Sequence, residues 1–467
     1  MPQPSRMMSI TGPAIWAHFA DDYEVGQAVL SLTIELAHRY IALVKWRNQL
    51  LALLCLAVFA GLGVLYFQHW VVQKPFGIIL IIGEGLAPET IALTRVYLGG
   101  SDAHLALDGM PHVALVTNHS RDFAVSDQAA AASALATGIK VSNRSLSVDP
   151  NGKPLASIIA LARSRGRATG LVTNGSLTNA TCAAFYAHAS NGNDTDQVAR
   201  QLVESGSFDI CLGMSVAEFL PELKQGKRQD NRDLLLELRQ SGFDIVRSRA
   251  EFEAIPVWSR PKLFGAFADG DDDRHQGQAW SDEPALSDMV RRAIELLQYN
   301  QRGYLLIVDA ARIRKAAEIN NAEKTLTETA ELDHTLSTAQ RYAGAKSTII
   351  VCGDTAIGGL HLNGFPFCKE SGIALVGLNP SGEPWMTWAT GPKGMQAYGA
   401  AKIPEKETPG DSNEGASKEQ TEPAAFYAKS ALNTVEDVVS FGTGPGTEAL
   451  HGTIDNTQIF KIIRDEL

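Results

Sequence analysis

The sequence contains few cysteines and no surplus of positive charge. Its five cysteines are an odd number, and no two of them stand at the close spacing typical of metal ligands: Cys55, Cys182, Cys211, Cys352 and Cys368. Neither a disulfide framework nor a cysteine-rich metal site is therefore indicated. The 41 Lys and Arg residues are outnumbered by 52 Asp and Glu residues, which gives a formal net charge of −11 at pH 7. This balance argues against nucleic acid, or an anionic membrane surface, as a partner.

One uncharged apolar run is long enough to cross a membrane. It reads "LLALLCLAVFAGLGVLYF", covers residues 50–67 and is extended by apolar residues as far as 72. Because a transmembrane helix needs about 20 apolar residues, we predict an anchor over residues 48–72. The 49 residues before the run are too many for the n-region of a signal peptide. A cleaved signal and a buried core helix remain the alternatives.

Basic residues beside this run set the predicted orientation. Lys45 and Arg47 directly precede the run, whereas Lys74 is the only basic residue close after it. The positive-inside rule then places residues 1–47 in the cytoplasm. The rest of the chain lies beyond the inner (cytoplasmic) membrane, in the periplasm or its extracytoplasmic equivalent. Within the cytoplasmic segment, residues 23–47 predict an amphipathic helix.

From residue 76 onward the pattern alternates between short apolar runs and helical segments. The runs that predict strands are 76–85, 168–175, 208–214, 243–248, 263–270, 303–310, 347–354 and 437–444. The segments that predict helices are 153–165, 194–205, 231–240, 284–299 and 322–343. This alternation predicts an α/β fold with a central, mostly parallel sheet flanked by helices on both faces, over residues 76–467.

Two polar segments interrupt this domain. Residues 393–430 are rich in Pro, Gly, Ser, Glu and Lys, and they predict a flexible surface insertion. The segment "DGDDDRH", residues 269–275, is either a solvated loop or a calcium-binding loop that lacks the rest of the usual pattern.

Three acidic residues occupy the carboxyl ends of predicted strands. They are Glu84, Asp309 and Asp354, and such strand ends meet at one edge of a parallel sheet. Three carboxylates brought together favour a metal site, although acidic residues also end strands simply because strand ends meet solvent and helix N-termini. A further feature is Asp127, which is expected to cap the helix that begins with Gln128 and an alanine run.

Several segments together resemble the alkaline phosphatase family. They are "IILIIGEGLA" (78–87), "SDQAAAASALATGIKV" (126–141), "VDPNGKPLASIIALARSRGRATGLVTNGSLTNATCAAFYAH" (148–188), "GYLLIVDAARI" (303–313), "STIIVCGDTAIGGL" (347–360) and "GTIDNTQIF" (452–460). Their order and spacing match the family over residues 76–467. The resemblance implies the family fold, and it implies a site with a serine nucleophile, an arginine that clamps phosphate, two zinc ions and one magnesium ion.

The positions that this resemblance assigns to catalysis have changed. Gln128 stands where the family has its serine, and Gly192 stands where it has its arginine. At the first zinc, an aspartate and two histidines of the family become Arg314, Glu318 and Asn433. No imidazole, the usual nitrogen donor to catalytic zinc, remains among these residues.

The remaining positions keep oxygen atoms but no nitrogen ligand. At the second zinc the family's aspartates correspond to Glu84 and Asp354, and its histidine corresponds to Thr355. At magnesium, Thr181 is retained and Asp309 replaces a glutamate. We therefore expect Arg314 to supply the cation that zinc would have supplied, with Glu318 one helical turn along to receive it.

These changes predict a membrane-anchored pseudoenzyme that acts as a structural or binding subunit and holds no metal. The alternative is a divergent phosphomonoesterase, or a related hydrolase, that holds one Mg²⁺ through Glu84, Thr181, Asp309 and Asp354. A third reading is an anion-binding protein without turnover, in which the Gln128 amide and its helix N-terminus contact phosphate. The resemblance also implies a homodimer, and the anchor offers surfaces for a membrane-protein complex.

Overall fold

The chain divides into two units, residues 1–73 and 74–467, which are described separately. We describe residues 14–66, 76–256, 262–268, 283–363, 384–394 and 422–467 of a computed structural model. The predicted loop 269–275, Cys368 and most of the predicted insertion 393–430 lie outside these residues.

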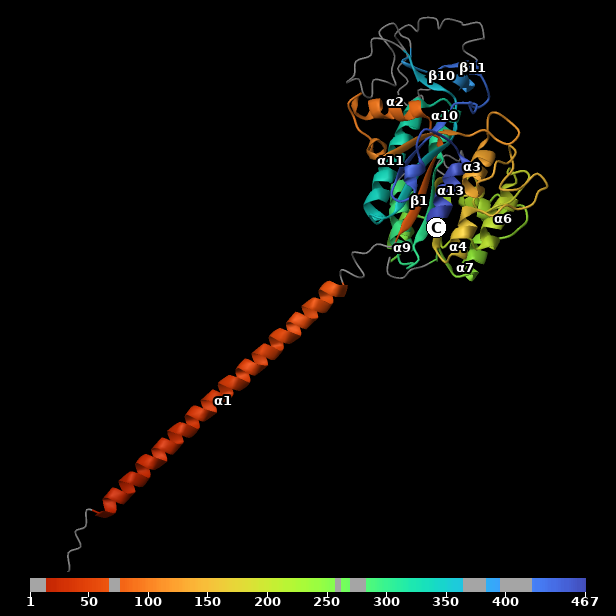
Figure 1. Ribbon diagram of the computed structural model, residues 1–467. Coiled ribbons are helices and arrows are strands. Elements are labelled where there is room, and N and C mark those ends of the chain that lie inside the picture. Colours follow the sequence, from red (N-terminus) through yellow and green to blue (C-terminus); the bar gives the residue numbers. More distant parts are fainter. Residues whose placement is uncertain (1–13, 67–75, 257–261, 269–282, 364–383, 395–421) are drawn as a thin grey trace, which may run out of the picture. The chain divides into compact units, whose positions relative to one another are not determined.

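The first unit contains a single long helix. Helix α1 (Ala14–Tyr66) runs without interruption for 53 residues, so the predicted helix over 23–47 and the start of the predicted anchor are one continuous element (Figure 1). Within it, Val29–Tyr66 is long and apolar enough to cross a membrane, and its 38 residues span about 57 Å at 1.5 Å per residue. That exceeds the roughly 30 Å hydrocarbon core, so only part of the helix fits inside a bilayer. A helix of this length and composition is typical of a membrane anchor or a signal sequence.

The second unit is built on a ten-stranded sheet. Its strand order is β13-β2-β12-β8-β1-β7-β3-β4-β6-β5. Seven neighbouring strands, from β8 to the edge strand β5, pair in parallel: β8 (Thr348–Ala356), β1 (Gly77–Gly85), β7 (Tyr304–Ala310), β3 (Ala168–Ser176), β4 (Ile210–Met214), β6 (Lys262–Ala266) and β5 (Phe243–Val246). The predicted mostly parallel sheet is confirmed.

The far end of the sheet departs from that pattern. Strand β12 (Val438–Thr443) is predicted by the sequence, but it runs antiparallel to both β8 and β2. Strands β2 (His112–Thr117) and β13 (Thr453–Asp455) have no counterpart among the predicted strands, because β2 alternates buried and exposed residues and β13 has only three residues.

Helices cover both faces of the sheet. The side chains of β1 show why the central strands are continuously apolar. One face packs against α3 (Gln128–Thr137), α4 (Ile158–Ser164), α6 (Thr195–Ser205), α7 (Leu234–Gln240) and α13 (Thr457–Glu466). The other packs against α2 (Pro88–Gly99), α9 (Leu286–Leu297) and α11 (Ala322–Tyr342) (Figure 1). Ile78, Leu80 and Ile82 enter the first core, whereas Ile79 and Ile81 enter the second. Since both faces are covered, both sets of alternating side chains are buried.

A small second sheet is formed by strands that come between β8 and β12 in the sequence. It consists of β9 (Leu360–Leu362), β10 (Met386–Gly391) and β11 (Ala424–Tyr427). Strand β11 lies near the end of the segment 393–430 predicted to be a flexible insertion, and it pairs with β10, which precedes that segment, so the prediction is wrong for this end of it. The helix predicted over 153–165 begins only at Ile158, because Ser157 caps it by accepting a hydrogen bond from the backbone N–H of Ala160.

Candidate functional site

Three neighbouring strands bring three acidic side chains to one edge of the sheet. Strand β1 lies between β7 and β8, and its Ile82 is level with Asp309 on one side and with Cys352 on the other. Glu84 and Asp354 follow two residues further on, so all three acids stand at the carboxyl ends of their strands. Glu84 is 3% exposed, Asp309 0% and Asp354 1%. The sequence therefore placed these carboxylates at the correct edge, and the structure buries them.

Burial of three like charges perturbs their protonation. Burial raises the pKa of Glu84 well above its usual range, and the nearby Asp309 and Asp354 raise it further. Burial likewise raises the pKa of Asp309 to about 7. The pKa of Asp354 is also raised by burial, but the positive charge of Arg314 opposes the shift. The positive charge of Arg314 lowers the pKa of Glu84 and of Asp354, but burial outweighs it, so the cluster favours neutral carboxyl groups.

Each acid of this cluster keeps one oxygen without a hydrogen-bond partner. The unpartnered buried atoms are Oε1 of Glu84, Oδ1 of Asp309 and Oδ2 of Asp354, together with Oγ1 of Thr181. The second oxygen of Asp309 accepts hydrogen bonds from Thr173 at 2.8 Å and from the Cys182 thiol at 3.3 Å. Sequence reasoning missed both of these donors, because both lie in the segment 148–188 but the resemblance assigns neither residue a role.

The guanidinium of Arg314 is the cation of this site. It is carried by α10 (Arg312–Glu318) and is 9% exposed. Its Nε donates to Glu318 at 2.9 Å, and its Nη1 donates to Asn433 at 3.0 Å and to Thr355 at 3.4 Å. The helical spacing predicted the Arg314–Glu318 pair, and the structure adds contacts to two further assigned positions.

Gln128 faces the same guanidinium. It opens α3, where the Asp127 carboxylate caps the helix by accepting from the N–H of Ala130 at 2.9 Å, as the sequence predicted. With its side-chain oxygen turned toward Arg314, the Gln128 amide accepts from Nη1 at 3.1 Å, from Nη2 at 3.0 Å and from Nε. The side chain at the nucleophile position is therefore engaged with a cation.

Gly192 lies at the edge of this arrangement. Its N–H donates to the carbonyl of Arg144 at 2.8 Å, and the N–H of Arg144 donates to the Asp127 carboxylate. A Cβ added at Gly192 would approach the Leu146 side chain to 2.9 Å. The residue thus links its loop to the cap of α3, but it supplies no positive charge to the site.

The donor set does not fit zinc. The residues assigned to the two zinc positions offer carboxylate, hydroxyl and amide groups, and the guanidinium of Arg314 contacts three of those residues. In the described part of the chain, no group of three or more His, Cys, Asp or Glu side chains is arranged so that it could hold a metal ion. Oxygen-only donors such as Glu84, Thr181 and Asp309 suit Mg²⁺ in kind, but they would have to move to enclose an ion.

Comparison with known proteins gives one family over nearly the whole second unit. The family model described as alkaline phosphatase matches residues 77–467. Alkaline phosphatase 4 of Bacillus subtilis is 26% identical over 432 residues, which cover 83% of this chain and 88% of that protein. The tissue-nonspecific alkaline phosphatase of Gallus gallus is 27% identical over 449 residues, covering 85% of each chain.

Solved structures share the fold. The alkaline phosphatase of the Antarctic bacterium TAB5 superposes with a TM-score of 0.62 at 22% identity, covering 84% of this chain and 98% of that chain. The enzyme of Thermus thermophilus superposes with a TM-score of 0.65 at 24% identity, covering 85% of this chain and 92% of that chain.

Removing the guanidinium should destabilise the fold. We expect Arg314→Ala to lower the free energy of unfolding by about 3–5 kcal/mol, because Glu318 and Asn433 lose a charged hydrogen-bond partner and the buried Asp354 loses a nearby positive charge. Arg249→Ala is the matched control, since Arg249 pairs with Glu253 at the same i,i+4 spacing, but its side chain is 42% exposed against 11% for Arg314. It should cost less than about 1 kcal/mol. Denaturant titrations measure the free energy of unfolding of each variant. An equal loss in the two variants would contradict the role of Arg314 as the compensating cation.

Asp309 should make stability fall as pH rises. Its folded pKa of about 7 lies above the unfolded value of about 3.9, so the native state holds more protons between these values. Stability is full below pH 4 and is lost by up to about 1.4 kcal/mol per unit as pH rises toward 7. Asp309→Asn removes this titration, so the variant should gain stability relative to wild type across that window. The exposed Asp244, changed to Asn, is the control. A stability difference that does not vary with pH would refute the shift.

Proposed function

The chain belongs to the alkaline phosphatase family, and on this premise we propose that it is a membrane-anchored pseudoenzyme that serves as a structural or binding subunit. One observation carries the proposal: the guanidinium of Arg314 contacts Gln128, Thr355 and Asn433, which occupy the positions of the nucleophile and of zinc ligands in the family. A permanent cation there repels zinc and compensates the neighbouring carboxylates instead.

Most of the groups that the resemblance assigns to phosphate-ester hydrolysis are replaced in this chain. The amide of Gln128 is not a nucleophile, and Gly192 cannot clamp a phosphate. Without zinc, neither the attacking nor the leaving oxygen is stabilised. The residues that remain are suited to holding one another in place, since each assigned polar side chain around Arg314 accepts a hydrogen bond from it.

A divergent Mg²⁺-dependent phosphomonoesterase is the second candidate, and the unpartnered oxygens of Glu84, Thr181, Asp309 and Asp354 favour it. These are oxygen donors of the kind that Mg²⁺ takes, and they belong to one cluster. Metal analysis of the purified full-length chain separates the candidates. Zinc near two equivalents contradicts both, magnesium near one equivalent supports the second, and absence of bound metal after extensive dialysis supports the first.

We predict that the protein does not hydrolyse simple phosphate monoesters. Loss of a nucleophile that acts together with its neighbours lowers the rate by roughly 10⁶. Gln128→Ser should not restore activity, because Arg314, Thr355 and Asn433 still prevent a zinc pair from assembling. The assay is release of the chromophore from an aryl phosphate at alkaline pH with added Zn²⁺ and Mg²⁺. Turnover at the rates usual for alkaline phosphatases, abolished by a chelator, would overturn the proposal.

For topology we predict that residues 1–47 face the cytoplasm and that the second unit is exported. Lys45 and Arg47 precede the apolar run within α1, and the positive-inside bias supports this orientation. In intact spheroplasts, a tag placed after Leu467 should be accessible to protease, and a tag at Met1 should be protected. The reverse pattern would refute the orientation. A shortened soluble product would show instead that the run is a cleaved signal.

A further inference from the structure

A surface groove lies next to β5, the last strand of the main sheet. In the strand order, β5 is far from β1, β7 and β8, which carry the acids of the candidate site. The groove has a volume of about 230 Å³, and its walls come from the segment around η4 (Glu222–Lys224), from α7 and from the end of β5. Four aliphatic side chains line it: Leu220, Leu235, Leu236 and Ile245. These four side chains, here called the aliphatic floor, lie beside four charged ones, so the groove offers a partner both apolar and charged contacts.

Three cationic side chains line this groove, and only one of them has an acidic partner among the described residues. Lys224 is paired with Asp233 at 2.7 Å. Arg239 and Arg247, which also line the groove, are exposed, and their guanidinium groups make no hydrogen bond or ion pair with the described residues. Two free guanidiniums in one groove are notable on a chain whose net charge is −11. Arg is also a residue type enriched at protein interfaces.

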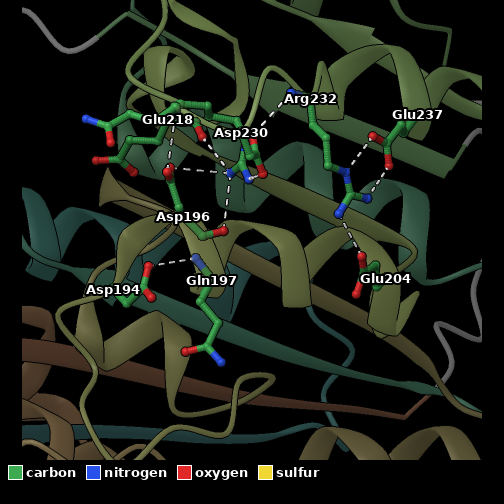
Figure 2. A network of polar contacts seen from close by, with 10 residues as sticks. Asp194, Asp196, Gln197, Glu204, Glu218, Asp230, Arg232 and Glu237 are labelled. Carbon is green, nitrogen blue, oxygen red and sulfur yellow. Dashed lines mark hydrogen bonds and ion pairs between the residues drawn. The ribbon is translucent and has the colours of Figure 1, made fainter.

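A polar network around the buried Arg228 and the half-buried Arg232 holds one wall of the groove in place. The side chain of Arg228 is 0% exposed, and it donates to the Asp230 carboxylate and to the backbone carbonyl of Glu218. Arg232 donates to Glu204 of α6 and to Glu237 of α7 (Figure 2). These contacts connect the segment before α7 to two helices, so the groove is preformed and a ligand does not have to order it.

On this fixed wall, large apolar side chains point outward. Leu223 in η4 is 91% exposed, and Leu236 in α7 is 45% exposed. The adjacent β5 is the last strand of the sheet and pairs with β6 alone among the described strands. An open strand edge beside exposed leucines is a surface that native proteins usually protect or use for binding.

We propose that this groove docks an acidic protein segment that carries large apolar side chains. The carboxylates of the segment pair with Arg239 and Arg247, and its apolar side chains cover Leu223, Leu236 and the aliphatic floor. The charge on the rim selects an acidic partner over a basic one. This inference deepens the proposed binding role by naming the chemistry of the partner. Peptide binding and phosphate hydrolysis are measured separately, so either idea can fail without the other.

The test uses the full-length chain in nanodiscs of zwitterionic lipid, with empty nanodiscs as the blank. The probe is a fluorescein-labelled octapeptide of alternating Leu and Glu, and its Leu–Lys counterpart is the charge control. Fluorescence polarisation should show saturable binding of the Leu–Glu peptide only. The variant Arg239→Glu/Arg247→Glu should weaken this binding by at least about tenfold, and Leu223→Asp should also weaken it. The exposed Lys346, changed to Glu, is the control for charge reversal and should bind as wild type does.

Several results would overturn the proposal. They are no saturable binding of the Leu–Glu peptide up to about 1 mM, equal binding of the two peptides, and equal affinity of wild type and the double variant. All substituted side chains are exposed, and a melting curve for each variant verifies folding. If wild type self-associates and the double variant does not, the groove is an interface between copies of this chain and not a site for a different acidic partner.

Discussion

The candidate site depends on the hydrogen bonds and the positive charge of the Arg314 guanidinium. Three adjacent parallel strands bring Glu84, Asp309 and Asp354 together at one buried edge, and such a cluster needs either protons or a cation. Arg314 supplies a cation from α10 and is held by Glu318, Asn433 and the Gln128 amide. The surrounding side chains accept hydrogen bonds from this permanent positive charge. The positions that the resemblance assigns to the nucleophile and to metal ligands therefore belong to one polar network.

This arrangement separates the fold from its family chemistry. The ten-stranded sheet and the helices on both faces are those of alkaline phosphatases, and they keep the strand ends in register. At that edge, amide, hydroxyl and guanidinium groups stand at positions that the resemblance to the family gives to serine, imidazole and carboxylate. A sheet of this kind tolerates such exchanges, because its core is formed by apolar side chains on both faces and not by the site.

The proposed structural or binding role depends on the surfaces of the chain. The long helix α1 provides an apolar segment that can enter a membrane, and the groove beside β5 provides a preformed surface with unpaired guanidiniums. The two features belong to separate units of the chain, and each is independent of phosphate chemistry. An anchored module with a rigid, charged groove needs no turnover to contribute to an assembly.

The sequence by itself determined the fold class, the edge at which the acids gather and the Arg314–Glu318 pair. Each of these follows from local rules: apolar runs for buried strands, the shared carboxyl edge of parallel strands, and the i,i+4 spacing of a helix. Only the tertiary structure decided that Gln128 and Asn433 converge on Arg314, that Thr173 and Cys182 donate to Asp309, that β12 is antiparallel, and that Leu220, Arg239 and Arg247 share a groove. Residues this far apart in the chain meet through packing, and periodicity within one segment carries no information about which distant side chains face each other.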